Sequence, residues 1–144
     1  MSDSATVVVE RFVPAPPAAV FGAWLDPQAL ARFMCACDGT FKAATATTDP
    51  RPGGRFSILM RVGEQELPHQ GVYEIIDANT LLVFSWHSHI AGPGSRVRLT
   101  FKPNGANGTH LRLEHEGLDG RSAKEAHRGG WTSILESLAM LGFS

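Results

Sequence analysis

The chain has 144 residues, of which 43% are hydrophobic and 19% are charged, and its formal net charge is −1 at pH 7. This length suits one continuous apolar core, and the composition is that of an ordered globular protein. The 13 Lys and Arg residues are scattered along the chain, which argues against a nucleic-acid partner and against an anionic membrane surface. We therefore expect residues 1–144 to form one domain.

The expected location of the protein is the cytoplasm. Residues 1–5 are polar and do not lead into an apolar segment, and no stretch approaches the ~18 apolar residues of a membrane-spanning helix. Cys35 and Cys37 are separated by one residue, a spacing that rarely allows an unstrained disulfide. We expect both to be reduced thiols. Their spacing is also not that of a standard zinc site.

The first part of the chain predicts one strand followed by two short helices. Residues 6–13 are rich in β-branched side chains, which favour a strand. Pro17 suits the first position of a helix, because proline has no N–H group to leave unpaired. Asp26 before Pro27 predicts the N-cap of a second helix that continues through Phe33.

Between residues 38 and 117, apolar residues alternate with polar ones, which predicts successive strands. Turn signals divide the stretch at residues 52–54, 77–79, 92–94 and 104–108. Connections this short join antiparallel neighbours, and the alternation is typical of a sheet with one solvated face. The residues assigned to the apolar face include Phe56, Ile58, Met60, Gly71, Tyr73, Ile75, Leu82, Phe84, Trp86, Val97, Leu99, Phe101, Leu111, Leu113 and His115.

The C-terminal segment predicts a helix of roughly twenty residues, about 30 Å long, that covers the apolar face. Ser122 and Glu125 match a capping box at its start. The pair Gly129-Gly130 costs about 1 kcal/mol per glycine relative to alanine. We favour a close approach of helix to sheet as the reason, and room for a ligand is the alternative. The apolar stripe of the helix consists of His127, Trp131, Ile134, Leu135, Leu138 and Leu141.

Five motifs follow one another along the chain. They are APPAAVF at residues 15–21, with Trp24 and Asp26-Pro27 behind it, PGGRF at 52–56, GVYEI at 71–75, LVFSW at 82–86 and HRGGW at 127–131. In this order and spacing they resemble the SRPBCC superfamily of START-like, helix-grip domains, in the branch named after the activator of the heat-shock ATPase. The resemblance covers nearly the whole chain.

The resemblance implies an α+β fold in which a curved antiparallel β-sheet wraps around a long C-terminal helix. Two short helices after the first strand close one end, and a cavity lies between. One departure concerns residues 33–37, which are apolar and carry two thiols here, whereas the family often has a polar segment at this point. We expect the entrance of the cavity to differ from that of its relatives for this reason.

The walls of the implied cavity are expected among aromatic and aliphatic residues, with a few polar groups that orient a ligand. His69 and His115 share the parity of the inward faces, and His127 lies on the helix stripe, so these histidines are candidates for the polar contacts. We favour the simpler explanation that each is a hydrogen-bonded residue of the core or rim. The expected walls are Trp24, Phe33, Phe56, Met60, Tyr73, Trp86 and Trp131.

The favoured function is the binding of a small hydrophobic or aromatic ligand, without cofactor or metal. Catalysis is disfavoured, because alternation turns Glu74, Glu114 and Glu116 outward and leaves no evident acid–base pair. Two alternatives stay open. One is an enzyme of the polyketide cyclase or hydrolase kind using cavity histidines, and the other is a co-chaperone-like module that binds a protein partner. The oligomeric state, monomer or homodimer, is also left open.

Overall fold

The computed structural model describes residues 6–34, 41–62, 65–88, 94–118 and 120–141. Within these residues ten elements follow one another along the chain. They are β1 (Val7–Val13), α1 (Pro17–Ala23), α2 (Pro27–Phe33), β2 (Phe41–Thr48), β3 (Arg55–Val62), β4 (Gln65–Asp77), β5 (Leu81–Trp86), β6 (Ser95–Pro103), β7 (Thr109–Glu116) and α3 (Arg121–Ala139).

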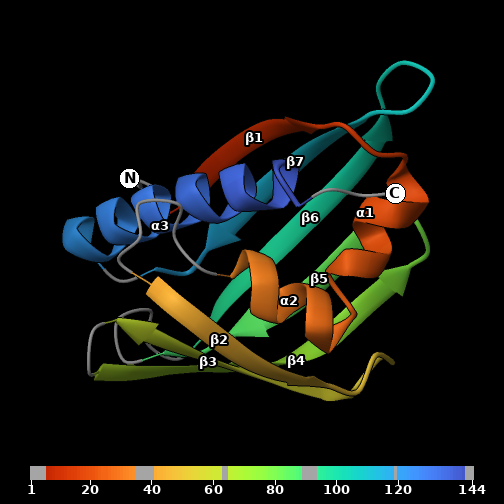
Figure 1. Ribbon diagram of the computed structural model, residues 1–144. Coiled ribbons are helices and arrows are strands. Elements are labelled where there is room, and N and C mark those ends of the chain that lie inside the picture. Colours follow the sequence, from red (N-terminus) through yellow and green to blue (C-terminus); the bar gives the residue numbers. More distant parts are fainter. Residues whose placement is uncertain (1–5, 35–40, 63–64, 89–93, 119, 142–144) are drawn as a thin grey trace.

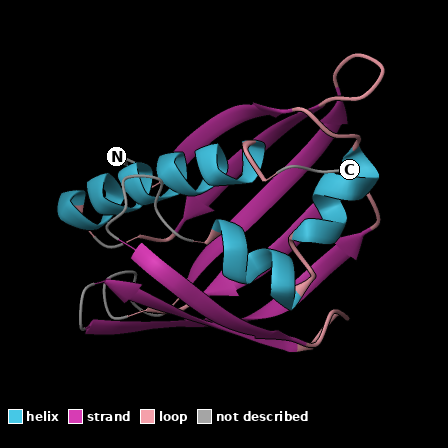
Figure 2. Ribbon diagram, in the orientation of Figure 1, coloured by secondary structure: helices cyan, strands magenta, loops and turns pink. Residues whose placement is uncertain are grey.

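The seven described strands form one antiparallel sheet in the order β1-β7-β6-β5-β4-β3-β2. Consecutive strands from β2 to β7 are neighbours, as their short connections require. β1 instead pairs with the last strand, with Val7 opposite His115 and Val13 opposite Thr109. The sheet is curved, and all three helices lie on the same side of it (Figures 1 and 2). The predicted α+β helix-grip architecture is confirmed.

The two short helices begin as predicted. α1 begins at Pro17, and α2 begins at Pro27 behind Asp26. The Asp26 carboxylate accepts a hydrogen bond from the backbone N–H of Gln28 at 3.0 Å, which satisfies one donor of the first turn. Both helices lie at one end of the sheet (Figure 1).

The start of α3 differs from the prediction. Gly120 occupies the N-cap position at φ 91°, and the helix begins at Arg121. The predicted capping box is wrong, because Ser122 lies inside the first turn and not before it. A backbone in the left-handed region favours glycine, so the local conformation and not a side-chain cap fixes this end.

One inward assignment on β4 is also wrong. Tyr73 pairs with Phe84 and Ile75 pairs with Val83, so Glu74 is an additional residue in a β-bulge. Beyond the bulge, positions that a regular strand would turn inward face outward, and the reverse. Ile75 is therefore 42% exposed, and Ile76 packs against the core in its place.

The core lies between the concave face of the sheet and the helices. α3 packs against β1 and α2. No described helix has the length and apolar character needed to cross a membrane. The predicted inward residues that are buried are Phe56, Ile58, Met60, Tyr73, Leu82, Phe84, Trp86, Val97, Leu99, Phe101, Leu111, Leu113 and His115, and α3 adds Trp131, Ile134, Leu135 and Leu138.

Candidate ligand-binding site

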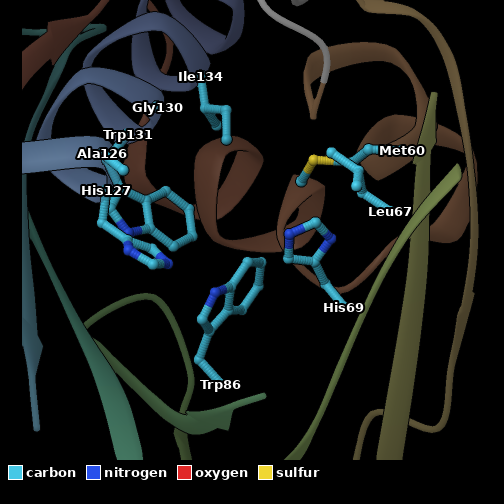
Figure 3. Close-up of a pocket in the computed structure, with 9 residues that line it drawn as sticks. All are labelled: Met60, Leu67, His69, Trp86, Ala126, His127, Gly130, Trp131 and Ile134. Carbon is cyan, nitrogen blue, oxygen red and sulfur yellow. The ribbon is translucent and has the colours of Figure 1, made fainter. Parts of the chain in front are cut away.

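A pocket of about 140 Å³ opens between α3 and the strands β3, β4 and β5 (Figure 3). An engineered apolar cavity of similar volume, about 150 Å³, holds one benzene molecule. The buried side chains of the lining form a floor, and the more exposed ones form a rim. The floor consists of Met60, Trp86, Trp131 and Ile134, and the rim consists of Leu67, His69, Ala126, His127 and Gly130.

Aromatic rings form much of the lining. The rings of Trp86 and Trp131 have centroids 4.9 Å apart, and the His69 ring lies 5.0 Å from Trp86 at an interplanar angle of 36°. Such rings offer flat, apolar surface on which another ring can pack with offset or edge-to-face geometry. The floor is therefore suited to a flat apolar group.

Gly130 opens the pocket on the helix side. A Cβ atom built on Gly130 meets no atom of the described residues within 4 Å apart from its chain neighbours and its own helix backbone, and the same is true of Gly129. Close approach of helix to sheet, the favoured explanation for this glycine pair, is therefore wrong. At Gly130 the missing side chain leaves open space in the rim of the pocket, and room for a ligand stays the alternative explanation for this glycine. Gly129 is exposed and does not line the pocket.

The structure brings five of the predicted site residues together around the pocket: Met60, His69, Trp86, His127 and Trp131. The other predicted aromatic residues lie in the core around it. Phe56 packs between Tyr73 and Trp86, with ring centroids at 5.3 and 6.2 Å, and Trp24 packs against Phe33 and Trp131 at 5.0 and 6.3 Å.

His115 is fully buried on β7, behind the floor, and does not line the pocket. The indole N–H of Trp131 donates a hydrogen bond to its Nδ1 at 2.9 Å. An indole nitrogen only donates, so Nδ1 is unprotonated and Nε2 carries the proton of the neutral ring. Burial, with a smaller contribution from the nearby His127, lowers the pKa of His115 from 6.5 to about 3. His115 is therefore neutral across the physiological range.

His127 presents the opposite tautomer. Its Nδ1 lies 2.8 Å from the carbonyl oxygen of Ala123, one turn earlier in α3. A carbonyl oxygen only accepts, so Nδ1 donates and Nε2 of the neutral ring carries a lone pair. The His115 and His127 rings are 4.9 Å apart at 85°. His69 projects from β4 on the opposite wall (Figure 3), so the histidines do not meet at one point.

Three buried side-chain N–H groups near the pocket lack a hydrogen-bond partner among the described residues. The indole Nε1 atoms of Trp24 and Trp86 and the Nε2 atom of His115 have no hydrogen-bond partner within the described residues. All three residues are at most 2% exposed. An unpaired buried donor costs about 1–3 kcal/mol, so a partner supplied by a bound molecule would offset part of that cost.

Four lining residues were not among the predicted site residues: Leu67, Ala126, Gly130 and Ile134. Leu67 has the parity of His69 on β4, and this signal could have identified it. Ala126, Gly130 and Ile134 recur every four residues and therefore share one helix face. Ala126 and Gly130 are small, and a search for large apolar side chains does not find small lining residues.

Few side chains that line the pocket can transfer a proton or attack a substrate. Among the described residues that line it there is no carboxylate, hydroxyl or thiol, and the two imidazoles are its titratable groups. The described part of the chain holds no group of three His, Cys, Asp or Glu residues placed to bind a metal ion. Cys35 and Cys37 lie outside the described residues.

The whole chain is similar to proteins of known structure. Protein CV1439 from Chromobacterium violaceum is 25% identical with a TM-score of 0.81, and the match covers 95% of this chain and 96% of that one. Protein MLL2253 from Mesorhizobium loti is 26% identical with a TM-score of 0.74, covering 94% and 95%. An HSP90 activator from Plasmodium falciparum is 21% identical with a TM-score of 0.74, covering 94% of each chain. No curated protein matches the chain.

A curved antiparallel sheet gripping a C-terminal helix, with a pocket beside that helix, defines the class of helix-grip domains. Residues 14–142 match the family described as Activator of Hsp90 ATPase homolog 1-like protein. The chain belongs to this family, which confirms the resemblance seen in its sequence motifs.

Proposed function

We propose that the protein binds a small aromatic or apolar molecule in the pocket between α3 and strands β3 to β5. The observation that carries this proposal is the open space beside Gly130, which leads onto the floor of Trp86 and Trp131. Burying apolar surface there contributes roughly 25 cal/mol per Å² of area removed from water. A pocket of about 140 Å³ supports a ligand of about one ring.

The first test is a thermal-shift screen with benzene, toluene, indole and naphthalene. Binding to the folded state raises its stability by RT ln(1 + [L]/Kd), so the melting temperature should rise with ligand concentration. One-ring compounds should give larger shifts than naphthalene at equal concentration. No shift for any compound would contradict the proposal.

Gly130→Leu and Gly129→Leu form a matched pair for locating the site. Both substitutions replace a helical glycine by a good helix former, so both should raise helix stability similarly. Only the leucine at 130 would project into the pocket rim. Toluene binding should weaken at least 10-fold in Gly130→Leu and stay within about 2-fold of wild type in Gly129→Leu. Equal effects of the two substitutions would place the ligand elsewhere.

Binding of a protein partner is the second candidate function. It is supported by the family's name and by the structural neighbour described as an HSP90 activator. The outer face of the sheet offers charge for such a contact, but Arg96 pairs with Glu74 at 2.8 Å and Arg112 pairs with Glu10 at 3.1 Å. These pairs reduce the net charge available to an acidic partner. Calorimetric titration with purified Hsp90 tests this function, and absence of heat at 50 μM would contradict it.

A further inference from the structure

The indole N–H of Trp86 is a buried donor that has no acceptor among the described residues. Trp86 lines the pocket and is 2% exposed, and its Nε1 finds no acceptor within the described residues. In Figure 3 this nitrogen lies on the edge of the indole that faces His127. Nε1 itself is enclosed by neighbouring atoms, so a ligand that supplies an acceptor at this end of the pocket satisfies it after a small shift of the indole or its neighbours.

His127 supplies the complementary group on the other side of that end. Its Nδ1 is engaged by the Ala123 carbonyl, so the lone pair of the neutral ring is on Nε2. Both residues belong to one ring cluster, because His115 lies 6.3 Å from Trp86 and 4.9 Å from His127 between ring centroids. Figure 3 shows the Trp86 indole and the His127 ring on the same side of the pocket, so a donor and an acceptor belong to that side of an otherwise apolar lining.

A hydroxyl group satisfies both atoms at once, because its oxygen accepts and its proton is donated. We propose that the ligand is a one-ring aromatic molecule carrying a hydroxyl group, a phenol. Its oxygen accepts from Trp86 Nε1–H, its proton is donated to His127 Nε2, and its ring packs on the floor of Trp86 and Trp131. This inference rests on the proposed function and names the class of molecule bound at that site.

The experiment compares phenol, anisole and toluene, which share the ring and differ in hydrogen bonding. The ¹⁵N-labelled full chain is titrated at pH 8, where an ordinary imidazole and phenol are both neutral. The chain has three tryptophans, so three indole N–H resonances are followed, and Trp→Phe variants assign them. Phenol should bind about 3- to 10-fold more tightly than toluene or anisole, as one or two net hydrogen bonds imply. Phenol should also shift the NMR resonance of the Trp86 indole proton downfield, and toluene should leave this resonance without a downfield shift.

Trp86→Phe and Trp24→Phe form the matched pair of variants. Each removes a buried indole N–H that lacks a partner in the described residues, but Trp24 does not line the pocket. Trp86→Phe should lower the preference for phenol over toluene to the part that the His127 hydrogen bond supplies, and it should bring anisole, which can only accept, to within about 2-fold of toluene. Trp24→Phe should leave the phenol preference at its full value. His127→Phe should abolish the preference for phenol over anisole, since the acceptor is then absent.

The outcomes separate this inference from the proposed function. Equal binding of phenol and toluene to the unmodified protein overturns the phenol assignment and leaves the apolar pocket intact. Failure of all three compounds to bind overturns the proposed function. A phenol preference that is undiminished in Trp86→Phe overturns the role of Trp86. If that variant does not fold, the comparison of the three ligands on the unmodified chain still tests the phenol assignment.

Discussion

The hydrogen bond between Trp131 and His115 joins α3 to β7 in the centre of the molecule. Both residues are buried, so the bond is shielded from water, and removal of one partner would leave the other unsatisfied. Alternation correctly placed His115 on the inward face. The tautomer and the bond partner could not be predicted, because they depend on how α3, the next element along the chain, is positioned against the sheet.

His115 should make the stability of the protein depend on pH. Its pKa is lowered to about 3 in the folded chain, first by burial and second by His127, whereas the unfolded chain takes up the proton near 6.5. The unfolded state therefore binds more protons below pH 6.5, and stability is lost as the pH falls from 6.5 toward 3. We expect this residue to account for about 2 kcal/mol lost between pH 7 and pH 5, measured by urea unfolding.

His115→Gln tests this assignment, because it removes the titrating group and keeps an amide oxygen that can accept from Trp131. The variant should lose correspondingly less stability between pH 7 and pH 5. His110→Gln serves as the control, because His110 is half exposed and paired with Glu10 on the outer face. A variant at 115 whose pH dependence equals that of the unmodified protein would show that His115 is not held neutral by burial.

At the scale of elements, α3 carries two glycines that its fold does not require. No atom lies within 4 Å of a Cβ at Gly129 or Gly130, and neither has a positive φ. Gly129→Ala and Gly130→Ala should therefore each raise the free energy of unfolding by about 0.5–1 kcal/mol in urea titrations. Gly71→Ala should do the opposite, because its Cβ would lie 1.9 Å from the carbonyl oxygen of Ser85. Destabilisation by alanine at 129 or 130 would contradict the open surroundings described for them.

Two backbone features reverse or shift what the side-chain pattern predicts. The bulge at Glu74 and the glycine N-cap at Gly120 are backbone features, and both interrupt a side-chain pattern. A periodic pattern predicts Ile75 inward because it assumes a regular pleat, and one additional residue reverses that assignment. Asp26 was predicted correctly because its cap is local: the carboxylate and the N–H group that it accepts from are two residues apart.

At the scale of the molecule, alternation and turn signals predicted the covering helix and the antiparallel neighbours within residues 38–117. They did not predict that β1 pairs with β7, because no turn joins these two strands. The pocket could not be predicted either, because its volume depends on sheet curvature and on small residues such as Ala126 and Gly130. The predicted aromatic walls include both core and pocket residues for the same reason: a sequence pattern indicates burial and does not distinguish a filled site from an open one. The cytoplasmic location stays a prediction.

The prediction of a single domain can be tested by unfolding. One cluster of buried residues connects α1, α2, the sheet and α3, and tryptophans report from α3, from β5 and from the end of α1. We expect tryptophan fluorescence and far-ultraviolet circular dichroism to follow one coincident transition in urea. Separate midpoints for the two signals would indicate parts of the chain that unfold independently.

The two sides of the pocket differ in how they are anchored. On one side, Trp131 belongs to a helix that packs on β1 and is bonded to β7 through His115. On the other side, Met60 and Leu67 face each other on β3 and β4, next to the edge strand β2. Displacing α3 breaks the buried hydrogen bond between Trp131 and His115. Displacing the opposite wall only bends β3 and β4, which lie near an edge of the sheet. The proposed ligand binding therefore predicts that the size of accepted ligands depends on how readily the β3–β4 hairpin moves, and that substitutions in this hairpin broaden the range of ligand sizes more than substitutions in α3.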